Sequence, residues 1–315
     1  MMIRRLGPIY LSGLMFLAVG LLASWPGAAG AAEGVAPDGR LRLGIVSPRP
    51  TKMIRIMQPL AEYLAKHLAT SGIRKGEAVA TPSVGSMVSY LRTGKVDVYI
   101  DSPFPSVVVA ELAGSKILLR RWKGGRPDYH TVFLARRDSG ISSLEELRGK
   151  MIAFEDPGST SAYFLPKAVL LRRGLTLAVK KDFNEAVAPG EVGYIFGGDE
   201  TNILIWTIRE KVHVTTVSND DWENLQENMK KELKVVARTE PVPRHLVSVR
   251  GDLPPALQAE IRRVLVGMEH SEEGRRVLKH VQKTDRFDEF PQGAEAQLRP
   301  VRDLIKYVRK EVGAL

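Results

Sequence analysis

The stretch KMIAFEDPGSTSAYFLPKAVLLRR, residues 150–173, contains a strand, a turn and a helix in direct succession. Residues 150–154 (KMIAF) form a short, mostly apolar segment, which is typical of a buried strand. Residues 155–160 contain Asp-Pro-Gly, a combination that favours a turn. Apolar residues then recur at helical spacing over residues 161–173. We therefore predict a strand–turn–helix unit at this point of the chain.

The same order recurs on both sides of this unit. Residues 40–46 (RLRLGIV) alternate like a strand and precede a helical pattern at 51–69. Residues 96–100 (VDVYI) precede a helix that Asp101, Ser102 and Pro103 open. After residue 173 we predict a strand at 192–196, a helix at 200–210 and a strand at 211–217. This alternation predicts an α/β fold of two lobes, each a mostly parallel sheet flanked by helices.

The two halves can be laid on each other so that the predicted helix caps Ser83 and Asp199 coincide. A structural duplication and a chance match both explain this weak correspondence. In the simplest arrangement, the chain crosses from lobe one to lobe two near Pro127 and returns near Pro243. Ligands of open α/β sheets bind outside the carboxyl ends of the strands, so we expect a site between the lobes.

This layout divides the chain into four parts. Residues 1–31 are a predicted signal peptide, 32–128 the first part of lobe one, 129–239 lobe two, and 240–315 the completion of lobe one with C-terminal helices.

The N-terminus has the order of a secretory signal. Two arginines at positions 4 and 5 precede a mostly apolar stretch at 9–25, and small residues follow at 28–32. We predict cleavage after Ala31 or one residue later. An uncleaved anchor is the alternative, but polar and small residues interrupt the apolar stretch. The mature protein is therefore expected in the periplasm.

Composition narrows the class of partner. The 315 residues include 46 Lys and Arg against 36 Asp and Glu, which gives a net charge of +10 and a pI near 9.7. Such a balance permits binding to small anions, anionic membranes or nucleic acid, and the export signal argues against nucleic acid. The chain has no cysteine, which excludes disulfides, thiol nucleophiles, cysteine metal sites and a lipid-modified cysteine.

The turn before the helix at 161–173 has features of an anion site. Ser159, Thr160 and Ser161 carry hydroxyl donors at a helix N-terminus, where unpaired N–H groups and a partial positive charge favour anions. Ordinary helix capping is the alternative, since Ser and Thr are preferred caps whatever the function.

Other polar residues stand at the ends of predicted strands or at the starts of the helices that follow. They are Ser47, Asp101, Ser102, Asp199, Glu200 and Asp220. Turn formation, capping and the helix dipole explain them without a ligand. In the functional alternative, they contact a ligand, and an acid accepts a proton from a protonated oxyanion or binds an amine.

Signals of catalysis are weak. The six histidines show no metal-ligand spacing, and there is no nucleophile elbow, Walker loop or dinucleotide fingerprint. We predict no enzymatic activity, no catalytic residue, no metal and no cofactor. The basic runs at 120–123 and 230–231 are predicted to be solvated faces.

Several segments together resemble the periplasmic substrate-binding proteins of phosphate, phosphite and phosphonate ABC transporters, within the type II periplasmic binding protein superfamily. The segments are LRLGIVSPRP (41–50), PLAEYLAKHL (59–68), GKVDVYIDSPFPSVVVAEL (94–112), residues 136–170, GGDE (197–200) and NDDW (219–222).

The resemblance implies a two-lobed binding protein without enzymatic activity that presents a small phosphorus oxyanion or a zwitterion to a permease in the inner membrane. It also implies that Ser159, Thr160 and Ser161 contact the ligand. We further expect the protein to be a monomer. Two alternatives remain: a sensor that presents a solute to a histidine kinase, and a protein for a solute without phosphorus. A phosphoryl hydrolase lacks evident metal ligands or a nucleophile with its base.

Two positions depart from the family pattern. Asp101 stands where an aromatic residue is usual, and Asp199-Glu200 stands where a histidine precedes an acid. A carboxylate that faces a dianion repels it unless one of the two carries a proton. We therefore expect a singly charged oxyanion, a zwitterion or another solute rather than fully ionised phosphate.

Overall fold

The structure is a computed structural model that describes residues 38–47 and 49–313. The predicted signal peptide and its cleavage site lie outside these residues. No helix in the described part of the chain is long and apolar enough to cross a membrane.

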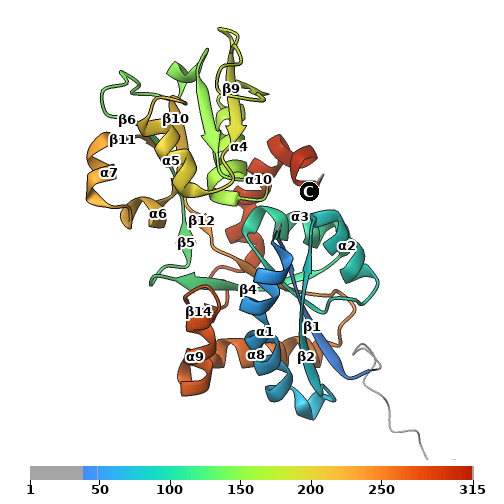
Figure 1. Ribbon diagram of the computed structural model, residues 1–315. Coiled ribbons are helices and arrows are strands. Elements are labelled where there is room, and N and C mark those ends of the chain that lie inside the picture. The colour runs from blue at the N-terminus through green and yellow to red at the C-terminus, as the bar shows by residue number, and fades with distance from the viewer. Residues whose placement is uncertain (1–37, 48, 314–315) are drawn as a thin grey trace, which may run out of the picture. The chain divides into compact units, whose positions relative to one another are not determined.

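Two six-stranded sheets flanked by helices form an α/β architecture (Figure 1). Sheet 1 has the order β14 (Thr284–Asp288), β4 (Lys116–Lys123), β13 (Leu246–Val249), β3 (Val98–Asp101), β1 (Arg40–Val46) and β2 (Lys75–Thr81). Sheet 2 has the order β11 (Leu233–Arg238), β6 (Thr131–Arg136), β10 (Val214–Ser218), β7 (Met151–Phe154), β9 (Glu191–Phe196) and β8 (Thr176–Val179). The predicted fold class is confirmed.

Most strands of each sheet run in one direction. In sheet 1, β1 is parallel to β2 and β3, while β13 is antiparallel to β3 and β4, and β14 is antiparallel to β4. In sheet 2, β7, β8, β9 and β10 are parallel, and β6 is antiparallel to β10 and β11. The carboxyl ends of several strands therefore meet at one edge of each sheet.

Helices cover both sheets. Sheet 1 carries α1 (Pro50–His67), α2 (Val84–Arg92), α3 (Pro103–Ala113), α8 (Pro255–Gly267) and α9 (Glu272–His280). Sheet 2 carries α4 (Leu165–Arg172), α5 (Glu200–Ile208), α6 (Asn219–Glu223) and α7 (Glu227–Glu232). The helix α10 (Ala294–Gly313) packs against α3 as well as α4, so it contacts helices of both sheets. Short 3₁₀ turns occupy Ala69–Ser71, Glu145–Leu147 and Met268–His270.

A two-stranded ribbon connects the sheets. β5 (Asp128–Tyr129) leads from β4 to β6, β12 (Val242–Pro243) leads from β11 to β13, and the two strands pair antiparallel. The predicted crossings fall at this ribbon, since Pro127 directly precedes β5 and Pro243 lies in β12. The domain boundaries at 128 and 239 stay a prediction.

Local sequence explains several helix starts. The predicted caps Ser83 and Asp199 accept hydrogen bonds from the backbone N–H groups of Ser86 and Asn202. The helix predicted at 161–173 begins differently, with a π-helical turn at Thr160–Phe164 that continues into α4. Such turns insert one extra residue per turn and are frequent at functional sites.

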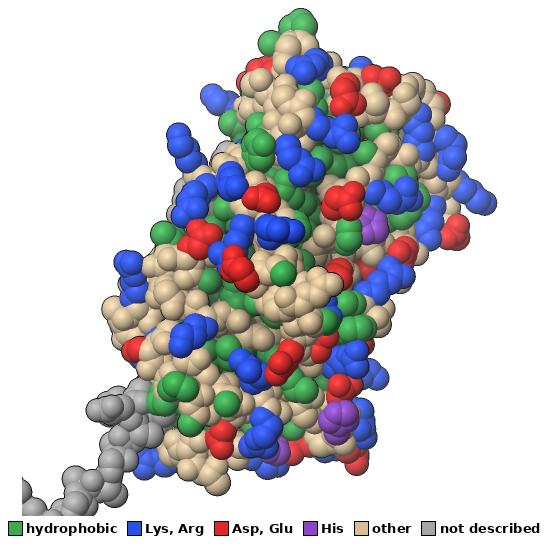
Figure 2. Space-filling model, turned by 180° about the vertical axis from the view of Figure 1, so that it is seen from behind, with side chains coloured by type: hydrophobic (Ala, Val, Ile, Leu, Met, Phe, Trp, Pro, Cys, Tyr) green, Lys and Arg blue, Asp and Glu red, His purple; other side chains and the backbone are tan. Residues whose placement is uncertain are grey.

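Figure 2 shows the distribution of charged side chains on one face of the molecule. On the face in Figure 2, Lys and Arg side chains are interspersed with Asp and Glu. On this face the basic side chains are therefore not gathered in a single patch.

Gly76 allows α1 to approach β2 closely. A Cβ atom on Gly76 would lie 1.9 Å from the carbonyl oxygen of Ala61 in α1. The Gln58 side chain bonds both the Gly76 carbonyl, at 3.0 Å, and the Ala78 N–H, at 2.9 Å. This helix–strand contact therefore depends on the absence of a side chain.

We expect Gly76→Ala to lower the free energy of unfolding by about 1–3 kcal/mol, because the backbone of α1 must shift to admit the methyl group. Urea unfolding checks the value. Gly190→Ala is the matched control, since its Cβ would meet no atom within 4 Å. Equal stabilities of the two variants would contradict the close approach.

Candidate functional site

Edge 1 is the end of sheet 1 at which β1, β3 and β4 finish. The antiparallel strand β13 begins at this edge. Edge 1 carries Ser47 after β1, Asp101 and Ser102 at the end of β3, Arg121 near the end of β4, and His245 before β13.

Edge 2 is the end of sheet 2 at which the parallel strands β7, β9 and β10 finish. It carries Glu155, Ser159, Thr160 and Ser161 after β7, Asp199 and Glu200 after β9, and Asp220 and Asp221 after β10. Strand direction therefore gathers the predicted site residues at two edges.

A buried hydrogen bond joins the two edges. The Thr160 hydroxyl donates to the Ser102 hydroxyl oxygen at 2.9 Å, and the backbone N–H of Phe104 reaches the Thr160 oxygen at 3.4 Å. Thr160 is only 2% exposed and Ser102 8%. The N-termini of α3 and of the helix that begins at Thr160 therefore meet at this hydrogen bond.

The neighbours of Thr160 hold the turn in place. The Ser159 hydroxyl oxygen caps the helix by accepting the N–H of Ala162 at 3.1 Å. The Ser161 carbonyl accepts a hydrogen bond from the Thr131 hydroxyl at 2.6 Å. Ser159 therefore acts as the ordinary cap that its residue type favours, and Thr160 is the hydroxyl that reaches edge 1.

Asp101 organises edge 1. Its carboxyl group accepts hydrogen bonds from the Tyr99 hydroxyl at 3.0 Å, the Val46 N–H at 3.3 Å and the Ser102 N–H at 2.7 Å. Burial raises the pKa of Asp101 to about 6, although these bonds act in the opposite direction. The side chain thus ties the end of β1 to the end of β3.

Ser47 belongs to the turn after β1. Its hydroxyl accepts the Arg49 N–H at 3.1 Å, and its own N–H donates to the Thr81 carbonyl at 3.0 Å. The described contacts of Ser47 are those of a turn residue, and none of them reaches edge 2.

Acidic side chains gather on edge 2. Burial and the neighbouring Asp156 raise the pKa of Glu155 to about 7. Burial and the neighbouring Asp221 raise the pKa of Glu200 to about 7 as well. Asp199 is exposed and caps α5. No group of three or more acidic or histidine side chains in the described residues could hold a metal ion.

Asp220 forms an ion pair with Arg244. A guanidinium N–H of Arg244, next to the ribbon strand β12, donates to the Asp220 carboxylate, and both side chains are largely buried. The Arg244 guanidinium also lies 5.1 Å from the centre of the Tyr129 ring. Asp220 therefore ties α6 to the ribbon between the sheets.

The prediction that residues 120–123 form a solvated face is wrong. Arg120 is 5% exposed and Arg121 3%, because both lie in β4, which β13 and β14 cover on either side. Arg120 forms an ion pair with Asp288 at 2.8 Å. The apolar residues before the run, Ile117 to Leu119, are the sequence signal of the strand.

Four residues of the two edges and the ribbon escaped the sequence analysis. They are Arg121, Tyr129, Glu155 and Arg244. Tyr129 lies beside Thr160, and burial raises the pKa of its phenol. Glu155 directly follows the predicted strand 150–154, so its position could have been noticed.

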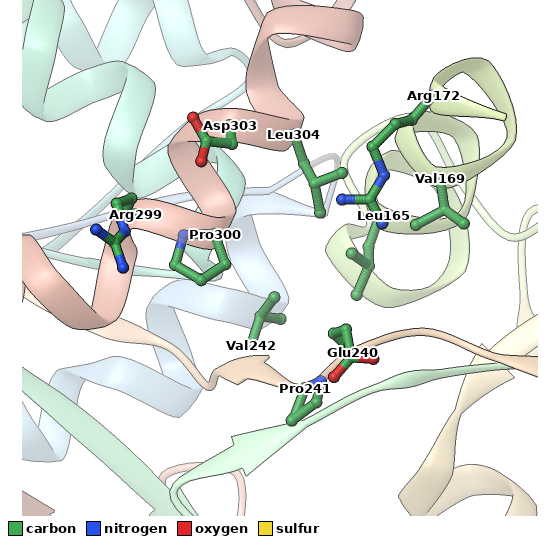
Figure 3. A pocket seen from close by; sticks show the side chains of 10 residues that line it. All are labelled: Leu165, Val169, Arg172, Glu240, Pro241, Val242, Arg299, Pro300, Asp303 and Leu304. Carbon is green, nitrogen blue, oxygen red and sulfur yellow. The ribbon is translucent and has the colours of Figure 1, made fainter. Parts of the chain in front are cut away.

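A separate pocket lies away from both edges (Figure 3). Its cavity volume is about 210 Å³, and it lies between α4, the segment that enters β12, and α10. Apolar side chains line it together with charged ones; they are Leu165, Val169, Arg172, Glu240, Pro241, Val242, Arg299, Pro300, Asp303 and Leu304. None of the predicted site residues contributes to it.

The model of a protein family described as the periplasmic substrate-binding protein of a phosphonate ABC transporter matches residues 45–292. The chain belongs to this family. It is a family of substrate-binding transport components, which agrees with the prediction that the protein is not an enzyme.

Solved structures and a curated relative are similar to this member of the family. XAC2383 from Xanthomonas citri, bound to chloride ion, is 32% identical with a TM-score of 0.81, and the match covers 87% of this chain and 100% of that one. XAC2383 has also been solved bound to ATP. The phosphate-import protein PhnD of Mycolicibacterium smegmatis is 33% identical over 152 residues, which are 46% of this chain and 44% of that protein. The chain thus aligns with less than half the length of this relative.

PhnD1 from Prochlorococcus marinus, in complex with methylphosphonate, shares the fold. Its TM-score is 0.63 at 15% identity, over 86% of this chain and 99% of that one.

Asp101 and Asp199, the two acids predicted to depart from the family pattern, both have local partners. Asp101 is engaged by groups of its own edge, and Asp199 caps a helix. At edge 2, the carboxyl groups of Glu155 and Glu200 have pKa values raised to about 7. Two acids of edge 2 are therefore partly protonated near neutral pH.

We expect the ionisation of Glu155 and Glu200 to lower the melting temperature as pH rises from 5 to 8, while the buried His245, whose pKa is lowered, acts in the opposite direction. The pKa values of the two glutamates are near 7 in the folded protein, above the ordinary value of 4.5. Their contribution to stability is therefore full below about pH 4.5 and lost as pH rises through 7.

The variant Glu155→Gln/Glu200→Gln removes both ionisations, so its melting temperature relative to that of the wild type should rise over the same range. Glu289→Gln, an exposed carboxyl outside the edges, is the control and should follow the wild type. Identical pH slopes in all three proteins would rule out the assigned role of the pair.

Proposed function

We propose that the protein binds a small oxyanion of phosphorus between edges 1 and 2 and delivers it to an ABC permease. The observation that carries the proposal is the hydrogen bond between Ser102 and Thr160. It brings two helix N-termini from different sheets to one point. Each N-terminus offers N–H groups and a partial positive charge, and the two hydroxyls add donors.

Hydroxyl and N–H donors in this arrangement suit a tetrahedral oxyanion. Ser102 belongs to the segment before α3, and Thr160 opens the helix that continues into α4. A ligand that inserts between the two hydroxyls would exchange their mutual bond for bonds to its own oxygens. Family membership and the curated phosphate-import relative support the same ligand class.

The acids near the site favour an oxyanion that retains a proton or carries an amine. A protonated carboxyl group can donate a hydrogen bond to a phosphoryl oxygen, whereas an ionised one repels it. Glu155 and Glu200, with pKa values of about 7, lie in the range where this choice depends on pH. Binding of a monoanion should therefore strengthen as pH falls from 8 toward 6.

Delivery follows from a change in the equilibrium between open and closed forms. A ligand held by donors of both edges binds the closed form better, because an open form separates Ser102 from Thr160. The ribbon of β5 and β12 is the natural hinge, since it is the double connection between the sheets. The permease would then recognise the closed form.

Isothermal titration with phosphate, phosphite, methylphosphonate, aminoethylphosphonate and sulfate tests the function. We expect one phosphorus oxyanion to bind, and Thr160→Val to weaken it about tenfold or more, because a hydrogen bond to a charged group is lost.

Thr207→Val is the matched control, since Thr207 is equally buried but bonds the Ile203 carbonyl within α5. Binding of phosphorus oxyanions that is the same in both variants would contradict the site, and binding of sulfate alone would contradict the ligand class.

A further inference from the structure

Arg121 is a buried cation at edge 1 to which the proposed function gives no role. Arg121 is 3% exposed, and its backbone N–H donates a hydrogen bond to the His245 carbonyl at 2.8 Å. Burial and the charge of Arg244 lower the pKa of Arg121 to about 10, so the guanidinium stays charged at neutral pH. A buried charge costs several kcal/mol unless a counter-charge offsets it.

The hydrogen-bond partners of Arg121 are neutral. One terminal nitrogen donates to the Gln282 side chain at 2.7 Å, and the other donates to His245 Nδ1 at 3.0 Å. Burial holds the pKa of His245 well below its ordinary value, so this imidazole is uncharged and can accept. The Nε–H of Arg121 is buried and has no partner among the described residues.

The neighbouring arginines are different. Arg120 forms an ion pair with Asp288, and Arg244 forms one with Asp220. No carboxylate in the described part of the chain forms an ion pair with Arg121. Asp101 and Asp285 act on it only through space, while Arg244 repels it. Among Arg120, Arg121 and Arg244, it is thus Arg121 that has no ion-pair partner in the described part of the chain.

The position of Arg121 relates it to the proposed ligand. β13 lies between β3 and β4, so two strand spacings, or about 10 Å, separate the ends of β3 and β4. Asp101 at the end of β3 acts on Arg121 electrostatically, as does Tyr129, which lies beside Thr160. The guanidinium therefore lies within electrostatic range of Asp101 at edge 1 and of Tyr129, the neighbour of Thr160 at edge 2, and we call it and the two helix N-termini together the polar region.

We propose that this region binds an anion with two oxyanion groups, of the diphosphate class. One group is held at the Ser102–Thr160 point, and the second is held by Arg121. This assignment rests on the proposed function and adds the class of ligand to it. The planar guanidinium, with an unused N–H, matches a terminal phosphoryl group better than a methyl or aminoethyl substituent.

Lys123 and Arg244 add positive charge next to Arg121, and the acids of edge 2 oppose it. Lys123 is half-buried and interacts with Arg121 and Arg244 as well as with Asp220 and Asp221. The positive end of the region is therefore on the side of β4. The second phosphoryl group should lie there, away from Glu155.

Isothermal titration of the wild type with orthophosphate and pyrophosphate, at equal ionic strength and pH 7, tests the inference. We expect pyrophosphate to bind at least tenfold more tightly than orthophosphate. Arg121→Gln should lower the affinity for pyrophosphate about tenfold or more and that for orthophosphate less than threefold.

Two further variants serve as controls. Arg126→Gln removes an exposed cation after the same strand, where it bonds Glu223, and should leave both affinities unchanged. Arg121→Lys keeps the charge but not the planar guanidinium, so it should retain only part of the preference. If Arg121→Gln does not fold, the test rests on the preference of the wild type and of Arg121→Lys for pyrophosphate over orthophosphate.

Equal or tighter binding of orthophosphate by the wild type would overturn the inference, as would an equal loss of both ligands in Arg121→Gln. Either result leaves the proposed function intact if orthophosphate binding still requires Thr160. Conversely, tight pyrophosphate binding that requires Arg121 but not Thr160 would support the second site and overturn the first.

Discussion

The hydrogen bond between Thr160 and Ser102 is the contact on which the account of this protein depends. It is buried, it joins residues of different sheets, and each partner stands at the N-terminus of a helix. Two positive helix ends that face each other are unfavourable without negative or polar groups between them. The hydroxyls supply part of that compensation, and an oxyanion would supply more. In the proposed site, this contact would therefore link the fold to the choice of ligand.

The surrounding charges are distributed unequally between the two edges. Edge 2 carries the acids Glu155 and Glu200, whose ionisation burial disfavours, whereas the side of β4 carries Arg121 and Lys123. The pair Arg244 and Asp220 connects these opposite charges beside the ribbon. In the proposed site, a ligand would meet hydroxyl donors in the middle, cations on one side and titrating carboxyls on the other. Ligand charge and protonation are thus expected to decide which solute is retained.

Much of the fold was predictable because it rests on local patterns. The βα units, the caps Ser83 and Asp199, and the placement of Ser102 and Thr160 after buried strands follow from periodicity and turn chemistry. The direction of parallel strands then gathers these residues at one edge of each sheet. Hydroxyls at such ends could therefore be proposed as a site before the structure was known.

Other parts required the tertiary structure. β4 pairs with β13 and β14, which are more than a hundred residues away, so the burial of Arg121 was not visible in its own segment. Asp101 looked like a repulsive neighbour of an anion, yet three groups of edge 1 occupy its oxygens. Partners distant in sequence decide the role of a charged side chain, and local sequence does not contain them.

A double-mutant cycle on ligand binding tests the central claim most directly. Ser102→Ala, Thr160→Val and the double variant would be titrated with the oxyanion that binds the wild type. If both hydroxyls serve one site, their effects are not additive, and the double variant shows a coupling of roughly 0.5–3 kcal/mol. Additive losses, or no loss from either change, would mean that the meeting point of the two helices is not where the ligand binds.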